Sequence, residues 1–235
     1  MKQSRLLILL VLFFVFDAKA SSQEYWPQEF CPETIDYTYY SLCYDREHRQ
    51  ARWVSHTLTL ESITAKQKRT NDYRKDPQIE DPVLSSDYRY SGFDRGHLVP
   101  AADMKLNHTA MSETFFMTNM SPQRPGFNRS IWASIEWDMR GFVFDYGTAH
   151  VVTAPVLHIG LKRIDSGVSV PETYYKIAYF PESQIMKAYL IDNQSQDDSE
   201  PEDFLVTVDE VEILTGIDFF SQLPDVLENQ LESQL

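Results

Sequence analysis

The chain has 235 residues, 43% of them hydrophobic and 13% aromatic, which suffices for one ordinary domain with a packed core and excludes wholesale disorder. Two cysteines exclude a disulfide-dense scaffold and a four-cysteine zinc site. A net charge of −14 argues at first sight against a nucleic-acid substrate, whose phosphates call for basic surface. However, thirteen acidic residues and no Lys or Arg lie from Asp192 onward, whereas residues 45–140 carry fourteen basic and thirteen acidic residues. The global charge therefore does not exclude such a substrate.

The first twenty residues have the layout of a secretory signal peptide. A short basic region, residues 1–5, precedes eleven apolar residues, Leu6–Phe16, and a small-x-small pattern at Ala18 and Ala20. A membrane anchor is the alternative, but eleven apolar residues cover about half of the ~20 that a bilayer requires. We therefore expect cleavage after Ala20, a single mature domain over residues 21–235, a secreted or periplasmic location and no stable membrane association.

Export would permit a disulfide, and Cys31 and Cys43 are the candidate pair. Their pairing would close a thirteen-residue loop, which the chain-entropy treatment values at about 3 kcal/mol. Two unpaired cysteines are the alternative. Neither cysteine has neighbours that suggest catalysis.

The hydrophobic pattern predicts a mixture of strands and helices. Alternation predicts a strand over residues 51–60, and the polar residues 64–91 predict a long surface loop of the kind that is often functional. Because strands and helices do not alternate regularly, we expect an α+β fold and not a doubly wound sheet. The other expected elements are strands at 115–120, 150–153, 172–179 and 186–191, a helix at 130–144, a loop at 194–203, and a helix at 206–215 that is entered after Thr207 and stops near Gly216.

The residues that carry chemistry lie between Gly92 and Arg140. They form the series Asp94-Arg95-Gly96-His97, Asn119-Met-Ser-Pro-Gln123, Phe127-Asn128, Trp132 and Glu136.

Hydrolysis of a phosphodiester needs a base that acts near neutral pH, and a hard cation or an arginine for the charge that develops on oxygen. His97, Arg95 and the amide oxygen of Asn128 would supply these functions, and Gly96 would let the backbone turn sharply. Glu136 would lie two turns after Asn128 if a helix starts there. Amide and carboxylate oxygens suit Mg²⁺, so the pattern favours a one-metal, water-rich site over a zinc cage.

Each of these residues also has an ordinary structural explanation. A lone histidine such as His97 is most often a surface or structural residue, Asn119 a hydrogen-bonding loop residue, Glu136 part of a solvated helix face, and Trp132 part of the core. The complete set, in this order and at these separations, is what favours a catalytic site.

The series resembles the sugar-non-specific DNA/RNA endonuclease family, the ββα-metal nucleases that are related to mitochondrial endonuclease G. The resemblance extends from about Arg52 to Leu223 and includes Tyr175-Lys176. It implies a central mixed or antiparallel sheet with packed helices and a ββα-metal motif. In that motif His97 would end one strand, Asn119 would lie on the next, and Asn128 and Glu136 would lie on the helix that follows.

The resemblance also implies a role for each residue. His97 would be the general base, Asn128 the direct ligand of Mg²⁺ (with Mn²⁺ able to substitute), and Arg95 a contact to the scissile phosphate. Asn119 would position groups around His97 or the phosphate, and Glu136 would hold a metal-bound water.

Two positions leave questions open. Family members often carry an upstream arginine that assists the phosphate, and Arg69 and Arg74 both qualify. A Thr-Gly-Pro stretch of the family reads Thr153-Ala154-Pro155 here, a change that we expect to affect a turn and not the chemistry.

We therefore expect a secreted or periplasmic Mg²⁺-dependent endonuclease that hydrolyses DNA and RNA with little sequence preference and leaves 5′-phosphate ends. The alternative is a catalytically silent exported protein that binds nucleic acid or another polyanion. The presence of a base beside a metal ligand argues against that alternative. A homodimer and an inhibitor protein remain open as partners.

Overall fold

The computed structural model describes residues 25–27 and 29–235, so the signal peptide predicted over residues 1–20 lies outside the described residues. The strands are β1 (Thr34–Asp36), β2 (Tyr40–Asp45), β3 (Gln50–Leu58), β4 (Asp94–His97), β5 (Met120–Gln123), β6 (Ala149–Pro155), β7 (Thr173–Phe180), β8 (Ile185–Asp192) and β9 (Leu205–Val206). The helices are α2 (Leu60–Thr64), α3 (His108–Glu113), α4 (Trp132–Tyr146), α5 (Val208–Thr215) and α6 (Asp225–Glu232).

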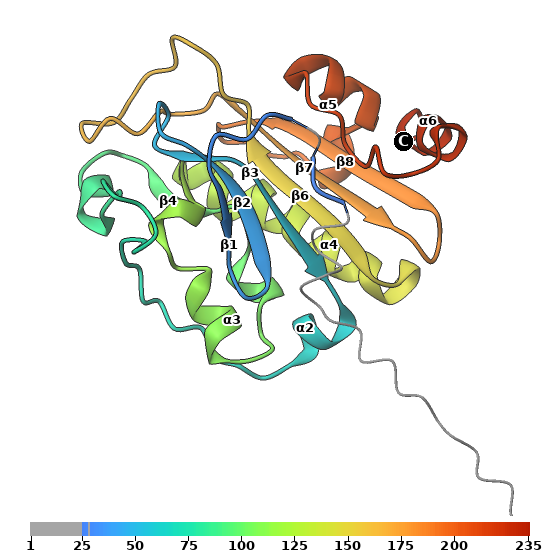
Figure 1. Ribbon diagram of the computed structural model, residues 1–235, viewed down its shortest axis with the longest axis horizontal. Coiled ribbons are helices and arrows are strands. Elements are labelled where there is room, and N and C mark those ends of the chain that lie inside the picture. The colour runs from blue at the N-terminus through green and yellow to red at the C-terminus, as the bar shows by residue number, and fades with distance from the viewer. Residues whose placement is uncertain (1–24, 28) are drawn as a thin grey trace, which may run out of the picture.

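Seven strands form one large sheet in the order β1-β2-β3-β6-β7-β8-β9, and each neighbouring pair is antiparallel (Figure 1). A second, two-stranded sheet pairs β4 with β5. The predicted α+β class is confirmed, and the central sheet is of the antiparallel kind.

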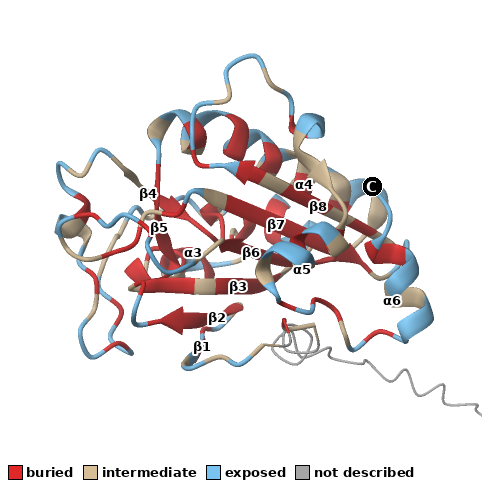
Figure 2. Cartoon of the chain, turned by 90° about the horizontal axis from the view of Figure 1, so that it is seen from above, coloured by how far each residue is buried: buried red, intermediate tan, exposed pale blue. Residues whose placement is uncertain are grey.

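Both faces of the large sheet are covered, which explains why its central strands are apolar on both sides (Figure 2). In β7, Tyr174 and Ala178 belong to a cluster with α4, whereas Tyr175 and Ile177 belong to a cluster with α5 and α6. Successive side chains of a strand point to opposite faces, so α4 lies on one face of the sheet and α5 and α6 on the other.

The beginning and end of α5 follow the prediction. Thr207 accepts a hydrogen bond from the Glu210 backbone N–H at 3.2 Å, and the Glu210 carboxylate accepts one from the Thr207 N–H at 2.9 Å. Such a reciprocal cap stabilises a helix start by about 1 kcal/mol. Gly216 ends the helix with φ of +69°, in the left-handed region that glycine adopts at little cost.

Two predicted elements differ in the structure. The strand expected at residues 115–120 is wrong, because Phe115 lies in a turn, Phe116 forms only an isolated bridge with Arg74, Met117–Asn119 form a 3₁₀ turn, and a strand begins only at Met120. The apolar run is buried mainly by side-chain packing. The expected helix also starts earlier, with a π-helical turn over Phe127–Ile131 ahead of α4.

The N-terminal part of the described chain is attached to β2. Cys31 and Cys43 form a disulfide with a Cα–Cα distance of 5.7 Å. None of the helices in the described residues is long and apolar enough to cross a membrane.

Candidate active site

The β4–β5 hairpin holds the central motif. In the antiparallel pairing, Asp94 lies opposite Gln123. His97 lies opposite Met120, the residue that directly follows Asn119. Because side chains alternate along a strand, Arg95 and His97 share one face of the hairpin and Asp94 faces the other way.

Gly96 lies in an extended strand, so the sharp turn expected at this residue is not present. Instead, Gly96 of β4 leaves room for the Gln123 side chain of β5. A Cβ atom at Gly96 would lie 2.0 Å from Oε1 and 2.5 Å from Cγ of Gln123, whose side chain is fully buried. Any larger residue between Arg95 and His97 would therefore force the buried Gln123 side chain to move.

His97 is buried between aromatic rings and has an unused nitrogen. Its ring centroid lies 4.9 Å from that of Phe115 and 5.7 Å from that of Tyr73, both edge-on. Within the described part of the chain, Nε2 has no hydrogen-bond partner. Burial, assisted by the positive charges of Arg69 and Arg95, lowers the pKa of His97 to about 3. The imidazole is therefore neutral at neutral pH.

Arg95 is held in place without a carboxylate partner among the described residues. Its Nη1 donates a hydrogen bond to the Ser85 hydroxyl, and its guanidinium lies 4.2 Å from the centroid of the Tyr73 ring. Tyr73 therefore contacts both Arg95 and His97. The guanidinium charge is not neutralised by an acid, which leaves it available to an anion.

Asn119 is completely buried and uses its amide to fix the chain on either side of the site. Oδ1 accepts from the Val99 N–H at 2.9 Å, and Nδ2 donates to the Val99 carbonyl at 3.0 Å and to the Thr114 carbonyl at 2.9 Å. These bonds connect the segment after His97 to the segment before β5. Asn119 therefore acts on the backbone around His97 and is not exposed to a phosphate.

Asn128 lies in the π-helical turn and is oriented by Asp94. Its Nδ2 donates to Asp94 Oδ2 at 2.9 Å, so its amide oxygen points away from this carboxylate. Arg129 forms a two-pronged ion pair with the same Asp94, at 2.6 and 2.8 Å. Although burial opposes it, the hydrogen bonds from Arg129 and Asn128 lower the pKa of Asp94 and keep it ionised.

Glu136 lies two turns further along, on α4, and has no hydrogen bond or ion pair with the described residues that would occupy its carboxylate. Burial raises the pKa of Glu136 to about 7, and the ammonium of Lys176 opposes this rise. Arg69 also acts on Glu136, as it does on His97. The two carboxylate oxygens are therefore available to a cation or to water.

The structure separates the two upstream arginines. Arg69 is exposed, stacks on Phe115 with its guanidinium 4.8 Å from the ring centroid, and forms no ion pair with a described acidic residue. Arg74 stacks on Phe116, at 4.0 Å, and is neutralised by Asp72 at 2.8 Å. Of these two arginines, Arg69 alone offers next to His97 a charge that no described acidic residue neutralises.

Sequence analysis missed a buried ammonium beneath α4. Lys176 is 1% exposed, donates from Nζ to Thr153 Oγ1 at 2.6 Å, and lies 5.0 Å from the centroid of the Trp132 ring. Thr153 belongs to the extended strand β6, so the substitution at Ala154 does not affect a turn as expected. A lysine within an otherwise apolar strand was the sequence signal for this group.

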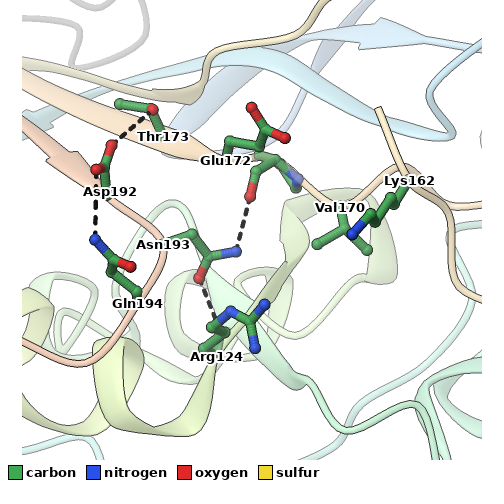
Figure 3. A pocket seen from close by; sticks show the side chains of 9 residues that line it. Arg124, Lys162, Val170, Glu172, Thr173, Asp192, Asn193 and Gln194 are labelled. Carbon is green, nitrogen blue, oxygen red and sulfur yellow. Dashed lines mark hydrogen bonds between the residues drawn. The ribbon is translucent and has the colours of Figure 1, made fainter. Parts of the chain in front are cut away.

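A pocket of about 320 Å³ lies beyond the end of β5 (Figure 3). Arg124 and Lys162 line it together with Glu172 and Asp192. Asn193 closes its base by accepting a hydrogen bond from the Arg124 backbone N–H at 2.8 Å. Since two cations face two carboxylates, the pocket does not present the single sign of charge that attracts phosphate.

Comparison with known proteins identifies the family of the chain. The DNA/RNA non-specific endonuclease family matches residues 18–226. Nuclease C1 of Cunninghamella echinulata is 32% identical over 204 residues, 78% of this chain and 81% of its own length. Human mitochondrial endonuclease G is 31% identical over 206 residues, 80% of this chain and 68% of its own length.

The fold agrees as well. The chain superposes on the crystal structure of an EndoG/EndoGI complex with a TM-score of 0.82 and 28% identity. The match covers 91% of this chain and 95% of the other.

The comparison corrects one expectation and establishes the family. The expected secreted or periplasmic location is wrong on this finding, because the human relative and the similar proteins of Saccharomyces cerevisiae and Schizosaccharomyces pombe are mitochondrial nucleases. The chain belongs to the DNA/RNA non-specific endonuclease family and is a nuclease.

Proposed function

We propose that this nuclease hydrolyses the phosphodiester bonds of both DNA and RNA in a Mg²⁺-dependent reaction, with His97 as the general base, and leaves 5′-phosphate ends. One observation carries the proposal. The His97 imidazole is buried and neutral, and its Nε2 has no hydrogen-bond partner among the described residues. Beside it lie Arg69 and Arg95, neither of which has an acidic partner in the described chain. A base and unpaired positive charge in one cluster are what attack on a phosphate requires.

In the proposed step, Nε2 of His97 takes a proton from a water molecule as its oxygen attacks phosphorus. The bond from phosphorus to the 3′ oxygen breaks, and the departing oxygen takes a proton from solvent. The phosphate then stays on the 5′ carbon of the next nucleotide. Arg95 and Arg69 would stabilise the charge on the non-bridging oxygens, whereas Arg74 would not, because Asp72 already neutralises it.

The residues near Asp94 fit a hard divalent cation. Asn128 directs an amide oxygen away from Asp94, and Glu136 has a carboxylate without a described partner, which is the all-oxygen donor set that Mg²⁺ or Mn²⁺ accepts. Asn128 would hold the ion directly and Glu136 through water. Once bound, the ion would supply positive charge to the phosphate. Asp94 and Arg129 keep the Asn128 amide in position for this role.

The proposed cleavage of both DNA and RNA follows from the chemical groups at the site. Arginine side chains, an imidazole and a cation recognise phosphate, which DNA and RNA share, and they do not read base edges. A 2′-hydroxyl is what distinguishes RNA from DNA at a binding site, and the proposed contacts do not use it.

The test is digestion of supercoiled plasmid and of total RNA, in Mg²⁺ and in EDTA, by the wild type and by His97→Ala. His158→Ala, at an exposed histidine outside the cluster, is the matched control. We expect Mg²⁺-dependent loss of both substrates with the wild type and the control but not with His97→Ala. Turnover by a folded His97→Ala variant would contradict the assignment of the base.

Two further variants test the ion and the upstream arginine. Asn128→Ala should raise the Mg²⁺ concentration needed for half-maximal activity, and an unchanged requirement would contradict its role as ligand. Arg69→Ala should lower kcat/KM more than Arg89→Ala, at an exposed arginine without an ion pair in the described chain. A wild-type protein that binds plasmid or RNA but does not cleave it would favour the alternative, a protein that binds polyanions without catalysis.

A further inference from the structure

Three carboxylates meet where α5 and α6 contact each other, on the face of the sheet opposite α4. Asp209 and Glu212 lie one turn apart on α5, and Glu232 is the last residue of α6. One carboxylate oxygen from each lies within 4.8 Å of the others. Asp209 and Glu212 are half-buried, and Glu232 is 5% exposed.

Glu232 lacks the partners that a buried carboxylate needs. Its Oε1 is buried and has no hydrogen-bond partner within the residues that the structure describes. The charged groups that act on it most strongly are acidic: Glu212, Glu228, Asp209 and Asp218. The sequence supplies no Lys or Arg from residue 192 to the C-terminus.

A negative charge on Glu232 would therefore be buried without a hydrogen bond to Oε1 and next to other acids. An unpaired buried charge is costly, and the usual compensation is a proton or a cation. One proton would neutralise Glu232 but would leave Asp209 and Glu212 facing each other across the same space. A divalent cation would compensate all three carboxylates at once.

The geometry favours calcium among divalent cations. Ca²⁺ binds carboxylate oxygens at about 2.3–2.6 Å, so oxygens on one ion lie up to about 5 Å apart, whereas Mg²⁺ demands a tighter octahedron and gives up water reluctantly. The Phe219 backbone N–H donates to Glu212 Oε1 at 2.7 Å, which fixes that carboxylate. We propose that Asp209, Glu212 and Glu232 form a structural Ca²⁺ site that fastens α6 to α5.

This site is separate from the catalytic groups and should affect stability without affecting chemistry. Bound Ca²⁺ would connect α6 to α5, while Leu231 and Val211 already pack together in the apolar cluster on this face of the sheet. Without the ion, repulsion among the carboxylates would loosen the last helix first.

The test is thermal unfolding of the full chain in EDTA and in excess CaCl₂. The wild type and Asn128→Ala should both gain about 5–10 °C when Ca²⁺ is present at about one hundred times its Kd. Glu232→Gln, which keeps the shape of the side chain, should lose this gain and melt higher than the wild type in EDTA. Glu202→Gln removes one exposed charge beside α4, away from this cluster, and should behave as the wild type.

Equilibrium dialysis with radioactive Ca²⁺ gives a second readout that does not depend on melting. The wild type should retain one more Ca²⁺ per chain than Glu232→Gln, and both should cleave plasmid in Mg²⁺ at equal rates. Equal retention by the two proteins, or an equal thermal shift, would overturn the proposal. A wild type that neither binds nor is stabilised by Ca²⁺ would also overturn it and would identify Glu232 as a protonated acid.

Discussion

Replacing Asn119 with alanine would remove three buried hydrogen bonds around the proposed base. They have donor–acceptor distances of 2.9, 3.0 and 2.9 Å, and the residue is completely buried, so water cannot replace them. Each bond contributes about 1 kcal/mol net, and a buried group left unpaired costs about 1–3 kcal/mol. We therefore expect Asn119→Ala to lower the free energy of unfolding by about 3–5 kcal/mol.

The assay is urea unfolding followed by tryptophan fluorescence, with Asn229→Ala on the surface of α6 as the control, where we expect a change within about 0.5 kcal/mol. At a temperature where Asn119→Ala is folded, kcat should fall while the Mg²⁺ requirement stays the same. Asn119→Asp can still accept from the Val99 N–H but cannot donate to the Thr114 carbonyl, so it should destabilise as strongly. A variant of wild-type stability that has lost activity would refute the positioning role and would indicate a direct contact with substrate.

Three further predictions follow from other buried contacts. Gly96→Ala should cost about 1–3 kcal/mol of stability through its clash with Gln123, and Gln123→Ala should restore part of that loss in the double variant; urea unfolding that shows no coupling would contradict the clash. Lys176→Met removes the ammonium that lowers the pKa of Glu136, so the acid limb of the kcat/KM profile should move to higher pH, and an unmoved limb would contradict this link. Burial lowers the pKa of His150 to about 4, so the stability that depends on its neutral form is complete above pH 6.5 and is lost as the pH falls toward 4. His150→Gln should reduce that acid-induced loss by up to about 3 kcal/mol in urea unfolding at pH 7 and pH 4, and an equal loss in both proteins would be contrary to the assignment.

The sequence was sufficient to predict elements whose residues encode their own boundaries. The helix after Thr207 carries its cap and its glycine stop in the sequence, and the strands around β7 carry β-branched and aromatic residues that suit a sheet buried on both faces. The prediction of a strand at residues 115–120 was wrong because a run of apolar residues indicates burial but does not determine the backbone conformation. Phe115 is buried against His97 and Tyr73, and the backbone pairs here only in a single bridge between Phe116 and Arg74.

The choice between Arg69 and Arg74 could not be made from the sequence, because residues 65–84 have no periodicity that fixes their register. Tertiary contacts make the distinction. Arg69 stacks on the ring of Phe115, and Arg74 stacks on the ring of the adjacent Phe116. Of the two arginines, Asp72 neutralises Arg74 alone. The buried Lys176 was missed for a related reason, since its partner Thr153 lies on a neighbouring strand 23 positions earlier in the chain.

The acidic character of the chain is compatible with a phosphate-cleaving site because of where the carboxylates lie. Seven of the thirteen acidic residues from Asp192 onward lie in the segment that begins with α5 at Val208, on the face of the sheet opposite α4. The sheet lies between these two layers, so they are two packing distances of about 10 Å each apart, which exceeds the distance of about 8 Å over which salt screens a charge in physiological solution. The field at His97 is set instead by Arg69 and Arg95, the two charges that lower its pKa. A substrate phosphate that approaches the hairpin therefore meets local positive charge, and the carboxylates of α5 and α6 act mainly on one another.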